Sequence, residues 1–494
     1  MTAEKTESTY EKVVELAKRR GFFWPSFSIY GGEAGFYDYG PLGVMLKDNI
    51  IRIWKEAYLR ENALLIDTPV LVPRAVFQAS GHVDKFLDIA AECDKCHLRQ
   101  KLETFTKSAG YEEVFDTVES GLSFVRDNVV KCTNCGTRIT RVYDVRQMFF
   151  LPDQGSSGDL FLRPETAQGI FINFKILNNL FRGKLPMAVA QTGKGFRNEI
   201  APRQSLIRMR EFNMCEVEVF VHPEKKFWAE IEYEDDITIC PRSSQPVTLN
   251  AREAVNSGII SSNAMGYFIT LTQQILLKMG ISRDRLRFRQ HEKNELAHYS
   301  FDSWDAEAEL DGNWIEITGI ADRNDLRNHE KTSGESMSVS TEEGDIVPSV
   351  IEPASGVDRI VLSVLMHSLK TRENGYTVLS LPPDVAPYHA AVFPLMKKNG
   401  MDQLAREIFR SLSLNDPCVF YDESGSIGKR YARQDEVGTP YCITIDGASL
   451  EDGTVTIRER DSAKQIRIAA EELINHGLIG NPSISLDKFK NQPS

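Results

Sequence analysis

GKGFRNEIAPRQSLIRMREFNMCEVEV, residues 193–219, joins a turn rich in charged side chains to a segment with the alternation of a β-strand. Successive side chains of a strand point to opposite faces. The turn carries Arg197, Glu199, Arg208 and Arg210. One strand face carries Arg210, Phe212, Met214, Glu216 and Glu218, and the other carries Cys215, Val217, Val219 and Val221.

The two faces of this strand need different surroundings. The valine-rich face is an ordinary core stripe. The other face crowds a guanidinium, an aromatic ring and carboxylates onto one wall, which is costly to bury unless they hold a charged, planar ligand. We therefore expect this wall to bind a nucleotide.

The chain as a whole has 494 residues, enough for about two or three domains. Its formal net charge of -12 argues against coating nucleic acid by bulk electrostatics, so a nucleic-acid partner would need local basic patches. No segment has the composition of a membrane span, and the N-terminus lacks the apolar run of a signal peptide. We expect a soluble, cytoplasmic protein with no membrane partner.

Apolar spacing predicts helices and strands along the whole chain. Helices are expected over 11–20, 42–59, 266–279 and 357–368, and strands over 186–191, 211–221 and 313–320. After the proline-punctuated run 377–395, the pattern is helix 401–414, strand 417–421, helix 427–437 and strands 440–446 and 453–460. This alternation is typical of a separate α/β domain. We predict a catalytic domain over 1–375, a second domain over 376–480 and a flexible tail over 481–494.

Four of the eight cysteines form two Cys-x-x-Cys pairs: Cys93, Cys96, Cys132 and Cys135. Four thiolates complete the closed tetrahedral shell of a structural zinc ion and leave no open position for chemistry. In a reducing compartment the pattern favours a metal over disulfides. We predict a zinc-binding insertion over 91–140, irregular between the pairs, with His97 facing solvent. The alternative is a metal-free insertion with unpaired thiols.

Further charged motifs lie at RPETAQ (163–168), WIEITGIADR (314–323) and EPASGVDR (352–359). Alternation predicts that Trp314, Glu316 and Thr318 share one strand face, with Arg323 beyond them. Glu352 precedes a small-residue turn, and Arg359 lies in the first turns of the next helix. Each motif alone is a weak signal, because most arginines and glutamates are solvated surface residues. Their order and combination carry the information.

The order of FRNE, REF, ExxG and GVDR resembles the signature of class II aminoacyl-tRNA synthetases. YGGEAGFYDYGPLG (30–43), RPETAQ, FRNEIAPR (196–203), ADR (321–323) and GKRYARQDEVGTP (428–440) together resemble glycyl-tRNA synthetases of the homodimeric type. The similarity runs from about residue 10 to residue 480. It implies an α+β fold: an antiparallel sheet with flanking helices that binds ATP in a bent form, and a C-terminal α/β anticodon-binding domain.

The resemblance also implies roles for the charged residues toward ATP, a substrate, and Mg2+. Arg197 would grip the α-phosphate, Glu199 would accept the adenine amino group, and Phe212 would stack under the adenine. Arg359 would cover the other adenine face and reach the γ-phosphate, while Glu316 would hold Mg2+. The implied catalytic residues are Arg197, Arg359 and Glu316. The implied ATP-binding residues are Arg197, Asn198, Glu199, Ile207, Arg210, Phe212, Glu316, Ile317, Gly356 and Arg359.

The implied reaction is ATP-dependent attachment of glycine to tRNA(Gly) through glycyl-adenylate, with release of AMP and pyrophosphate. Glycine has no side chain, so its pocket must bind the ammonium and carboxylate groups and exclude a Cβ atom. By resemblance, acids surround the ammonium and Arg323 lies near the carboxylate. The implied glycine-binding residues are Arg99, Glu165, Phe212, Glu216, Arg323, Glu352 and Ser355.

The chain departs from the family pattern at Ala354, where a serine is usual, although Ser355 follows it. The hydroxyl contact with the ligand is then lost, supplied by Ser355, or replaced by a water. We predict that Ser355 does not fully substitute and that glycine binds more weakly. Ala354→Ser should lower the glycine KM.

Two further segments indicate partners. Pro69, in LLIDTPVLVP (64–73), matches the dimer-forming motif of the class, so we expect a homodimer. The alternative is an edge-strand proline of no wider meaning. Lys429, Arg430 and Arg433 are expected to contact the tRNA backbone; the alternative is a solvated helix face.

Two other functions compete with glycine ligation. A nucleic-acid-binding relative that kept the fold but lost catalysis is disfavoured because Arg197, Glu199 and Arg359 are all present. A synthetase for another amino acid, such as histidine or proline, is disfavoured by the carboxylates around the implied pocket and by the YDYGPLG segment.

Overall fold

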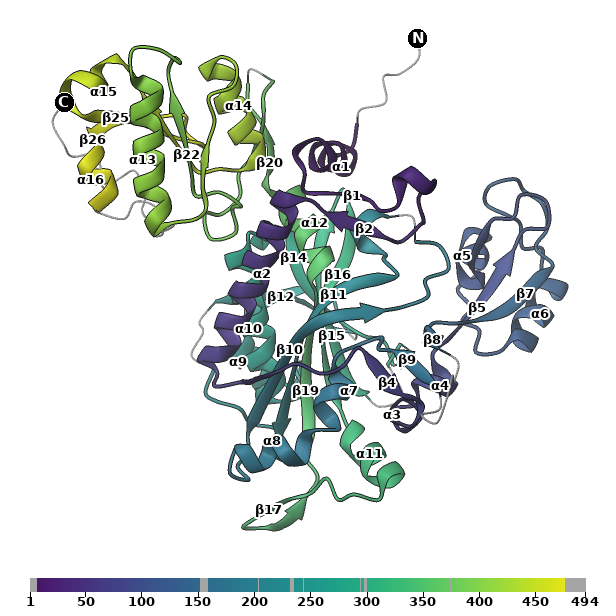
Figure 1. Cartoon of the computed structure of the whole chain (residues 1–494). Helices are drawn as coiled ribbons and strands as arrows, with labels where there is room; N and C mark the ends of the chain where they lie inside the picture. The colour runs from purple at the N-terminus through teal and green to yellow at the C-terminus, as the bar shows by residue number, and fades with distance from the viewer. Residues whose placement is uncertain are drawn as a thin grey trace.

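A computed structural model describes residues 7–151, 159–202, 204–231, 235–242, 244–293, 295–296, 300–373 and 375–475. A central body carries a C-terminal unit on one side and a smaller unit that projects from the other (Figure 1). Among the described helices, none combines the length and the apolar character that a membrane span requires. The tail predicted over 481–494 lies outside the described residues.

The central body is built on a nine-stranded sheet in the order β13-β12-β14-β15-β16-β19-β11-β10-β3. From one edge to the other, the strands are Val247–Asn250, Asp236–Cys240, Leu286–Gln290, Ser300–Leu310, Asn313–Arg323, Ser349–Gly356, Glu211–Val221, Met187–Phe196 and Leu64–Ile66. All neighbours from β14 to β10 are antiparallel, while β12 and β3 pair in parallel near the edges. The predicted antiparallel sheet is confirmed.

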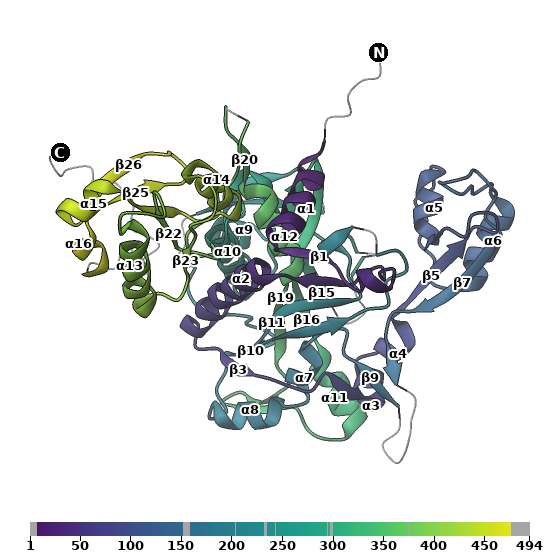
Figure 2. The same ribbon diagram turned by 45° about the horizontal axis from the view of Figure 1, so that its top comes forward.

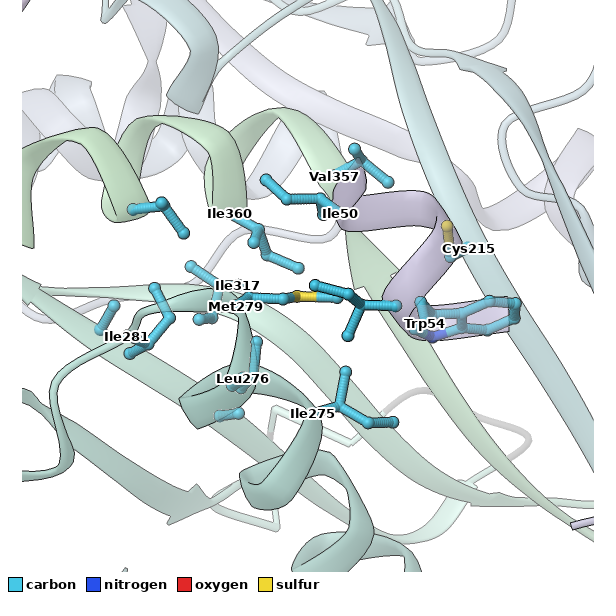
Figure 3. Packing of buried hydrophobic residues seen from close by; sticks show 14 of the residues in the cluster. Ile50, Trp54, Cys215, Ile275, Leu276, Met279, Ile281, Ile317, Val357 and Ile360 are labelled. Atoms are coloured by element: carbon cyan, nitrogen blue, oxygen red, sulfur yellow. The ribbon is translucent and has the colours of Figure 1, made fainter. Parts of the chain in front are cut away.

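Helices cover one face of this sheet: α2 (Pro41–Arg60), α10 (Asn263–Met279) and α12 (Val357–Ser368). Figure 3 shows their apolar side chains meeting the sheet, with Trp54, Met279 and Ile360 packed near Cys215 and Ile317. The valine-rich face of β11 therefore lies in the core, as its composition predicted. Helix α1 (Thr9–Arg20) also joins this core, and Ser8 and Glu11 form a capping box at its start.

Smaller elements border the opposite face of the sheet. Among these smaller elements, the hairpin of β1 (Phe23–Pro25) and β2 (Tyr37–Tyr39) and helix α9 (Ala251–Asn256) instead pack with the core of the first face. Those on the opposite side are helices α3 (Arg74–Ala79), α4 (His82–Lys85), α7 (Ala167–Phe171), α8 (Phe174–Leu180) and α11 (Asp325–Ser333), and the strands β4 (Leu71–Pro73), β8 (Phe150–Leu151), β9 (Leu160–Leu162), β17 (Val339–Thr341) and β18 (Gly344–Ile346). They leave the charged face of β11 open at its centre, where a cavity forms.

The projecting unit is a three-stranded sheet of β5 (Leu87–Glu92), β6 (Arg99–Lys101) and β7 (Arg141–Arg146), which extends beyond the expected 91–140 (Figure 2). The segment between the cysteine pairs was expected to be irregular, and this prediction was wrong. It forms α5 (Leu102–Ser108) and α6 (Val118–Asp127), because Leu102, Phe105, Phe115 and Val125 supply a small core of their own.

The C-terminal unit has a five-stranded sheet in the order β23-β22-β24-β25-β26. The strands are Val419–Tyr421, Ala390–Pro394, Tyr441–Ile445, Thr454–Glu459 and Gln465–Ala469, with helices α13 (Met401–Asn415), α14 (Ile427–Val437), α15 (Gly447–Asp452) and α16 (Ala470–Asn475). The first three strands are parallel. A hairpin of β20 (Leu369–Thr371) and β21 (Thr377–Leu379) connects this unit to α12. The α/β class predicted for this region is confirmed.

Candidate functional site

A cavity of about 290 Å³ lies on the charged face of the central sheet. Its walls come from β11, β15, β16, β19, the start of α12, the turn between β10 and β11 and the segment that follows β14. The lining residues are Glu165, Arg197, Glu199, Leu206, Ile207, Arg208, Met209, Phe212, Asn213, Met214, Glu216, His291, Glu295, Ser303, Asp305, Glu316, Ile317, Gly319, Ile320, Ala321, Arg323, Glu352, Ala354, Gly356, Asp358 and Arg359. Motifs separated by up to about 200 residues in sequence thus meet in one site.

Strand register explains why there is space above this part of the sheet. Residues directly opposite each other on neighbouring strands share a face. One row runs from Glu216 through Ala354 to Gly319 and Asp305. The next row brings Glu352 beside Ala321. Small residues therefore form the floor of the cavity, and carboxylates stand around them.

Two glycines of the opening sequence stretch allow β10 to lie close to this site. A Cβ atom on Gly195 would lie 2.6 Å from Cε2 of Phe212, and one on Gly193 would lie 2.2 Å from Nη2 of Arg163. Real Cβ atoms do not approach other heavy atoms this closely. Gly193 and Gly195 thus leave room for the Arg163 guanidinium and the Phe212 ring.

A β-bulge corrects the predicted face of Thr318. On β15, Ala306 pairs with Thr318 but the next residue, Glu307, pairs with Glu316, so Ile317 is the extra residue. Thr318 consequently points with Ala306 into the core, while Glu316 stays on the cavity side. Sequence alternation cannot foresee an inserted residue.

Ser355 also lies on the core side, which contradicts its predicted contact with glycine. It pairs directly with Cys215, a core residue of β11, and its Oγ lies 3.0 Å from Oγ1 of Thr318. Ala354 lines the cavity instead. Because neighbouring strand residues face opposite ways, Ser355 cannot supply a hydroxyl to a ligand in this cavity.

Arg197 lies between two aromatic rings at one end of the cavity. Its guanidinium carbon is 5.5 Å from the ring centre of Phe212 and 5.4 Å from that of Phe86. Phe86 immediately precedes β5 of the projecting unit. Both distances are within the range of cation–π attraction. No pattern in the sequence predicts Phe86 beside this arginine.

Arg359 and Glu316 form a pair across the same end of the cavity. Nη1 of Arg359 donates to Oε2 of Glu316 at 3.0 Å and to its carbonyl oxygen at 2.8 Å. Nε of Arg359 donates to the Ile207 carbonyl at 3.1 Å. Desolvation opposes ionisation of Glu316, but the charge and hydrogen bond of Arg359 outweigh it and lower the pKa of Glu316. Both side chains are therefore charged and placed for a charged ligand.

The start of α12, which carries Arg359, is fixed by Asp358. The Asp358 carboxylate accepts hydrogen bonds from the Asn213 backbone at 2.6 Å and from its amide side chain at 2.8 Å. The Tyr39 hydroxyl donates to the same carboxylate at 2.6 Å. These bonds tie α12 to β11 and β2. Gly356, Ile207 and Ile317, three predicted ATP-binding residues, line the cavity around this point.

Two predicted ATP-binding residues lie beside the cavity without lining it. Arg210 pairs with Glu33 at 2.8 Å and donates to the Glu199 carbonyl at 3.4 Å. The Asn198 side chain donates to the Arg146 carbonyl at 3.2 Å. In the described structure Arg210 thus supports the turn that holds Glu199, and Asn198 ties that turn to β7.

The opposite end of the cavity is a buried network around Arg323. Its Nε and Nη2 donate to the two carboxylate oxygens of Asp325 at 2.8 and 3.0 Å. Nη2 also donates to Glu165 at 3.3 Å, and Nη1 donates to Glu352. The side chain of Arg323 is only 1% exposed. One guanidinium therefore links three carboxylates, a geometry that suits its fixed fork of donors.

Glu216 completes this acidic end and is held by Thr166. The Thr166 backbone N–H donates to Oε2 of Glu216 at 2.5 Å, and the Thr166 hydroxyl donates to the same oxygen. Burial and the nearby Glu165 raise the pKa of Glu216, and the Thr166 bonds oppose this. Burial also opposes ionisation of Glu165, but Arg323 and His82 reverse the balance and hold its pKa well below its usual range. A cationic group is the ligand that such a pocket favours.

Arg99, the remaining predicted glycine-binding residue, lies elsewhere, and that prediction is corrected. It is on β6 of the projecting unit, where its Nε donates to Glu92 at 2.9 Å. Within the described residues it does not line the cavity. A position close in sequence to the cysteine pairs follows the projecting sheet and not the central one.

Sequence reasoning missed the contribution of β15 to the site. Asp305, which lines the cavity, contacts His291 at 2.8 Å and Arg289 at 3.0 Å. The signal was present, because SFDSWDAEAEL (300–310) alternates polar residues with Trp304, Ala306 and Ala308. This is the pattern of a half-buried strand.

The two cysteine pairs of the projecting unit meet as two equivalent knuckles. In each knuckle, the backbone carbonyl of the first cysteine accepts from the N–H of the residue four positions on, and its N–H donates to the carbonyl of the residue five positions on. These partners are His97 and Leu98 for Cys93, and Gly136 and Thr137 for Cys132. The Sγ atoms of Cys93 and Cys135 are 3.5 Å apart, as are those of Cys96 and Cys132. All four lie within 4.8 Å of one another. This donor set fits a tetrahedral zinc ion.

In the C-terminal unit the three predicted tRNA contacts have different surroundings. Arg430 is buried: it donates to the Pro394 carbonyl at 2.5 Å and lies over the Phe393 ring. The prediction for Arg430 is therefore wrong. Lys429 is exposed, and Arg433 pairs with Asp422 at 2.5 Å while staying partly exposed.

Comparison with known families gives two matches along the chain. A model described as the tRNA synthetase class II core domain (G, H, P, S and T) matches residues 150–373. A model of an anticodon binding domain matches residues 389–476. Together they cover the cavity, the central sheet except its edge strand β3, and the C-terminal unit.

The chain is also similar to curated proteins over nearly its full length. It is 38% identical to a glycine–tRNA ligase of Methanocaldococcus jannaschii, over 94% of this chain and 98% of that protein. A glycine–tRNA ligase of Methanothermobacter thermautotrophicus is likewise 38% identical, over 94% of this chain and 98% of its own length. The first alignment spans 571 positions, more than the 494 residues here, so that protein has internal segments that this chain lacks.

Solved structures with the same fold are more distant in sequence. A Giardia lamblia prolyl-tRNA synthetase in complex with prolyl-adenylate superposes with a TM-score of 0.59 at 16% identity, covering 94% of this chain and 75% of that chain. A Cryptosporidium parvum prolyl-tRNA synthetase with halofuginone and AMPPNP gives a TM-score of 0.60 at 14% identity, covering 96% and 78%. At these identities the similarity is one of fold.

Proposed function

The chain belongs to the glycine–tRNA ligase family, and we propose on that premise that it attaches glycine to tRNA(Gly) at the expense of ATP. The reaction passes through glycyl-adenylate and releases AMP and pyrophosphate. The observation that carries the proposal is that one continuous cavity joins an arginine-rich, aromatic end to a carboxylate-rich end. The first end suits a nucleoside triphosphate, and the second suits an ammonium group.

Adenylate formation needs positioning and charge stabilisation more than a base. The glycine carboxylate is already ionised at neutral pH, so it can attack the α-phosphate directly. Arg197 is the group that would neutralise charge developing on that phosphate, and its two aromatic neighbours hold it in place. Phe212 and Arg359 would enclose the adenine, with Glu199 at its edge.

Mg2+ would be held by Glu316 together with phosphate oxygens. Glu316 faces the cavity directly across from Glu307, and Asp305 is nearby on the same strand as Glu307. Carboxylates on one side and substrate phosphates on the other are the ligands that Mg2+ takes in such sites. When bound, the ion supplies charge neutralisation to the leaving pyrophosphate.

Glycine selection would rest on the buried acidic end. Glu165, Glu216 and Glu352 would surround the ammonium group, and hydrogen bonds from Thr166, Gln168 and Arg323 restrict their side chains. A site whose walls cannot retreat leaves no volume for a Cβ atom. One added methylene is otherwise worth only about 1–3 kcal/mol of discrimination.

The decisive experiment is amino-acid-dependent exchange of pyrophosphate into ATP. Glycine alone should support exchange. Exchange with proline or histidine would identify a synthetase of different specificity, and no exchange with any amino acid would indicate a binding protein that has lost catalysis. Charging of tRNA(Gly) transcripts with glycine would then test the second step.

We also propose that the four cysteines of the knuckles hold a structural Zn2+ ion. Metal analysis should find about one zinc per chain, in line with four-thiolate sites. Cys132→Ser should lose this zinc, whereas Cys240→Ser, on β12 of the central sheet and outside any cluster of metal-ligating side chains among the described residues, should keep it. Equal zinc contents in both variants would contradict the assignment.

A homodimer is proposed from an exposed apolar strip at the β3 edge of the sheet. Ile172, Ile176 and Leu180 are spaced by four residues and are 45%, 63% and 70% exposed. Leu65 on the edge strand β3 is also 44% exposed, on the opposite side of the strand from Leu64 and Ile66, which pack against the core under α8. Apolar surface of this kind marks protein interfaces.

The dimer is tested by sedimentation of a charged variant. Ile176→Asp should sediment as a monomer, whereas Leu414→Asp, at an exposed leucine of α13, should sediment like the unaltered protein. If the Ile176→Asp protein is still a dimer, the interface does not include this apolar strip.

The C-terminal unit is proposed to bind the tRNA anticodon, so Lys429→Ala should weaken tRNA charging without altering pyrophosphate exchange.

A further inference from the structure

Glu218 is a buried carboxyl group beneath the acidic end of the cavity, and the proposed reaction assigns it no role. Glu218 is 0% exposed, and neither of its carboxyl oxygens has a hydrogen-bond partner among the described residues. The three acids proposed to bind the ammonium differ from it, since each accepts at least one hydrogen bond. A buried, unpaired carboxylate is among the most unfavourable groups a protein can hold.

Strand register places Glu218 opposite Glu352. On β11 and β19, Glu216 pairs with Ala354 and Val219 pairs with Ile351, so both strands advance by three residues between these pairs. Glu218 and Glu352 therefore occupy one rung, on the same face of the sheet. Directly opposed side chains have Cβ atoms about 4.5–5.5 Å apart, and like charges there repel.

The charges around this rung cannot neutralise two carboxylates. Facing Glu218 are Glu352 on β19, Glu216 on β11 and Glu165 before α7, whereas Val189 faces it from β10. Asp325 on α11 adds a further negative charge near Glu352. Arg323 on β16 is the fixed cation, and it already contacts Glu165, Asp325 and Glu352. The two histidines of the region, His82 and His329, contact Glu165 and Gln168 and not Glu218.

We propose that Glu218 is a neutral carboxylic acid that pairs across the sheet with ionised Glu352 and positions it for the glycine ammonium. The guanidinium of Arg323 donates to Glu352, so the negative charge belongs there and the proton belongs to Glu218. A protonated carboxyl offers one O–H donor, and Glu352 is the acceptor across the rung. Glu218 is a positioning residue, and this role rests on the proposed function.

The electrostatics of the pocket support this arrangement. Burial, followed by repulsion from Glu352, raises the pKa of Glu218 well above its usual range, although Arg323 opposes the shift. Burial raises the pKa of Glu352 as well, but Arg323 donates directly to Glu352 and not to Glu218, so the proton that the pair holds belongs to Glu218. The pattern matches a carboxyl group kept neutral by an apolar, acidic site. With Glu218 neutral, the incoming ammonium meets fewer competing charges below the pocket.

The proton is tested directly by infrared spectroscopy, which needs no catalysis. The unaltered protein should show the carbonyl stretching band of a protonated carboxylic acid at neutral pH, and Glu218→Gln should lose it. Glu103→Gln, at a glutamate on α5 of the projecting unit, serves as the matched control and should keep the band. If Glu218→Gln leaves the band unchanged, the neutral carboxyl is not Glu218 and the proposal is overturned.

The positioning role is tested by the glycine KM in pyrophosphate exchange. Glu218→Gln keeps a neutral group with a donor, so the glycine KM should stay within about threefold. Glu352→Gln removes the proposed ammonium ligand and should raise it roughly 100-fold. Glu218→Leu, which has no donor, should raise the glycine KM about tenfold and leave the ATP KM unchanged.

Two outcomes in this assay contradict the positioning role. Glu218→Gln could be as damaging as Glu352→Gln, which would make Glu218 an ionised ligand; or Glu218→Leu could leave the glycine KM unaltered. Failure of the proposed function is distinguishable, because exchange would then be missing in the unaltered protein while the infrared band remained.

Discussion

The two ends of the cavity differ in how far their charged side chains are buried and paired. At the nucleotide end, the side chains of Arg359 and Glu316 are 33% and 49% exposed, and they pair with each other beside solvent. At the amino-acid end, Arg323 is 1% exposed and holds its acids in a closed network. The first can rearrange at little cost to admit the triphosphate that we propose it binds, whereas the second is already organised as the proposed glycine site requires.

This difference follows from where each end lies on the sheet. The nucleotide end is formed by the turn before β11 and the first turn of α12, where side chains reach water. The acidic end lies over the middle of β11, β16 and β19, where cross-strand neighbours surround every side chain. Small substrates need the rigid location, because selectivity against a methyl group requires walls that do not move.

The largest contrast is expected in stability when each arginine is removed. Arg323→Met leaves several carboxylates buried without their cation and should lower the free energy of unfolding by about 3–5 kcal/mol. Arg359→Met, at the exposed end, should change it by less than about 1 kcal/mol. Urea unfolding of both variants gives the comparison. Similar stabilities would mean that the two ends do not differ as described.

Pyrophosphate exchange, unlike stability, should depend strongly on Arg359 at the exposed end. Arg359→Lys keeps the positive charge but not the flat guanidinium, so it can neither stack on a base nor span two phosphate oxygens. Pyrophosphate exchange should fall roughly 100-fold, with the ATP KM raised and the melting temperature unchanged. Arg285→Lys, at a partly exposed pair with Glu309 outside the cavity, is the matched control and should keep its activity.

The floor of the acidic end offers a smaller test. Ala354 lies between Glu216 and Gly319, and Ser355 points to the core, so Ala354→Ser adds the only hydroxyl at this position that can reach the cavity. The glycine KM should fall by about fivefold, the effect of one hydrogen bond. An unchanged or higher KM would favour a water, or no polar contact, at this place.

The smallest expected effect concerns pH and Glu218. Because the folded protein raises the pKa of Glu218 above its ordinary value of 4.5, the folded state binds more protons than the unfolded state above that pH. This group therefore destabilises the fold increasingly as pH rises from 4.5 towards the raised pKa. Glu218→Gln should be more stable than the unaltered protein at pH near 7, and the gap should close on acidification.

Chemical denaturation over a range of pH measures this gap. A gap of constant size would show that Glu218→Gln alters packing and not a proton. Glu316→Gln is an instructive comparison from the exposed end, because the pKa of Glu316 is lowered and its contribution has the opposite sign.

Sequence patterns were sufficient for the parts of the fold that have a regular period. The apolar stripe of 42–59 and the alternation of 211–221 each correspond to an element with nearly the expected bounds. The charged motifs identified the sheet face that carries the cavity, because side chains on one strand face must meet whatever lies above that face. Motif order along the chain then indicated the family.

What the sequence could not supply depends on local exceptions and on contacts between distant segments. The bulge at Ile317 turned Thr318 away from Glu316, and register alone decided that Ala354, not Ser355, faces the cavity. Phe86 reaches Arg197 only because the projecting unit is attached beside the turn. That neither carboxyl oxygen of Glu218 accepts a hydrogen bond from the described residues is visible only when all neighbouring side chains are in place.

A crystal structure with a non-hydrolysable glycyl-adenylate analogue would test the two-ended cavity most directly. The adenine should stack on Phe212, the phosphate mimic should contact Arg197, and the ammonium should lie among Glu165, Glu216 and Glu352. An analogue bound with its ammonium outside that acidic pocket, or with its adenine away from Phe212, would contradict the assignment of the two ends.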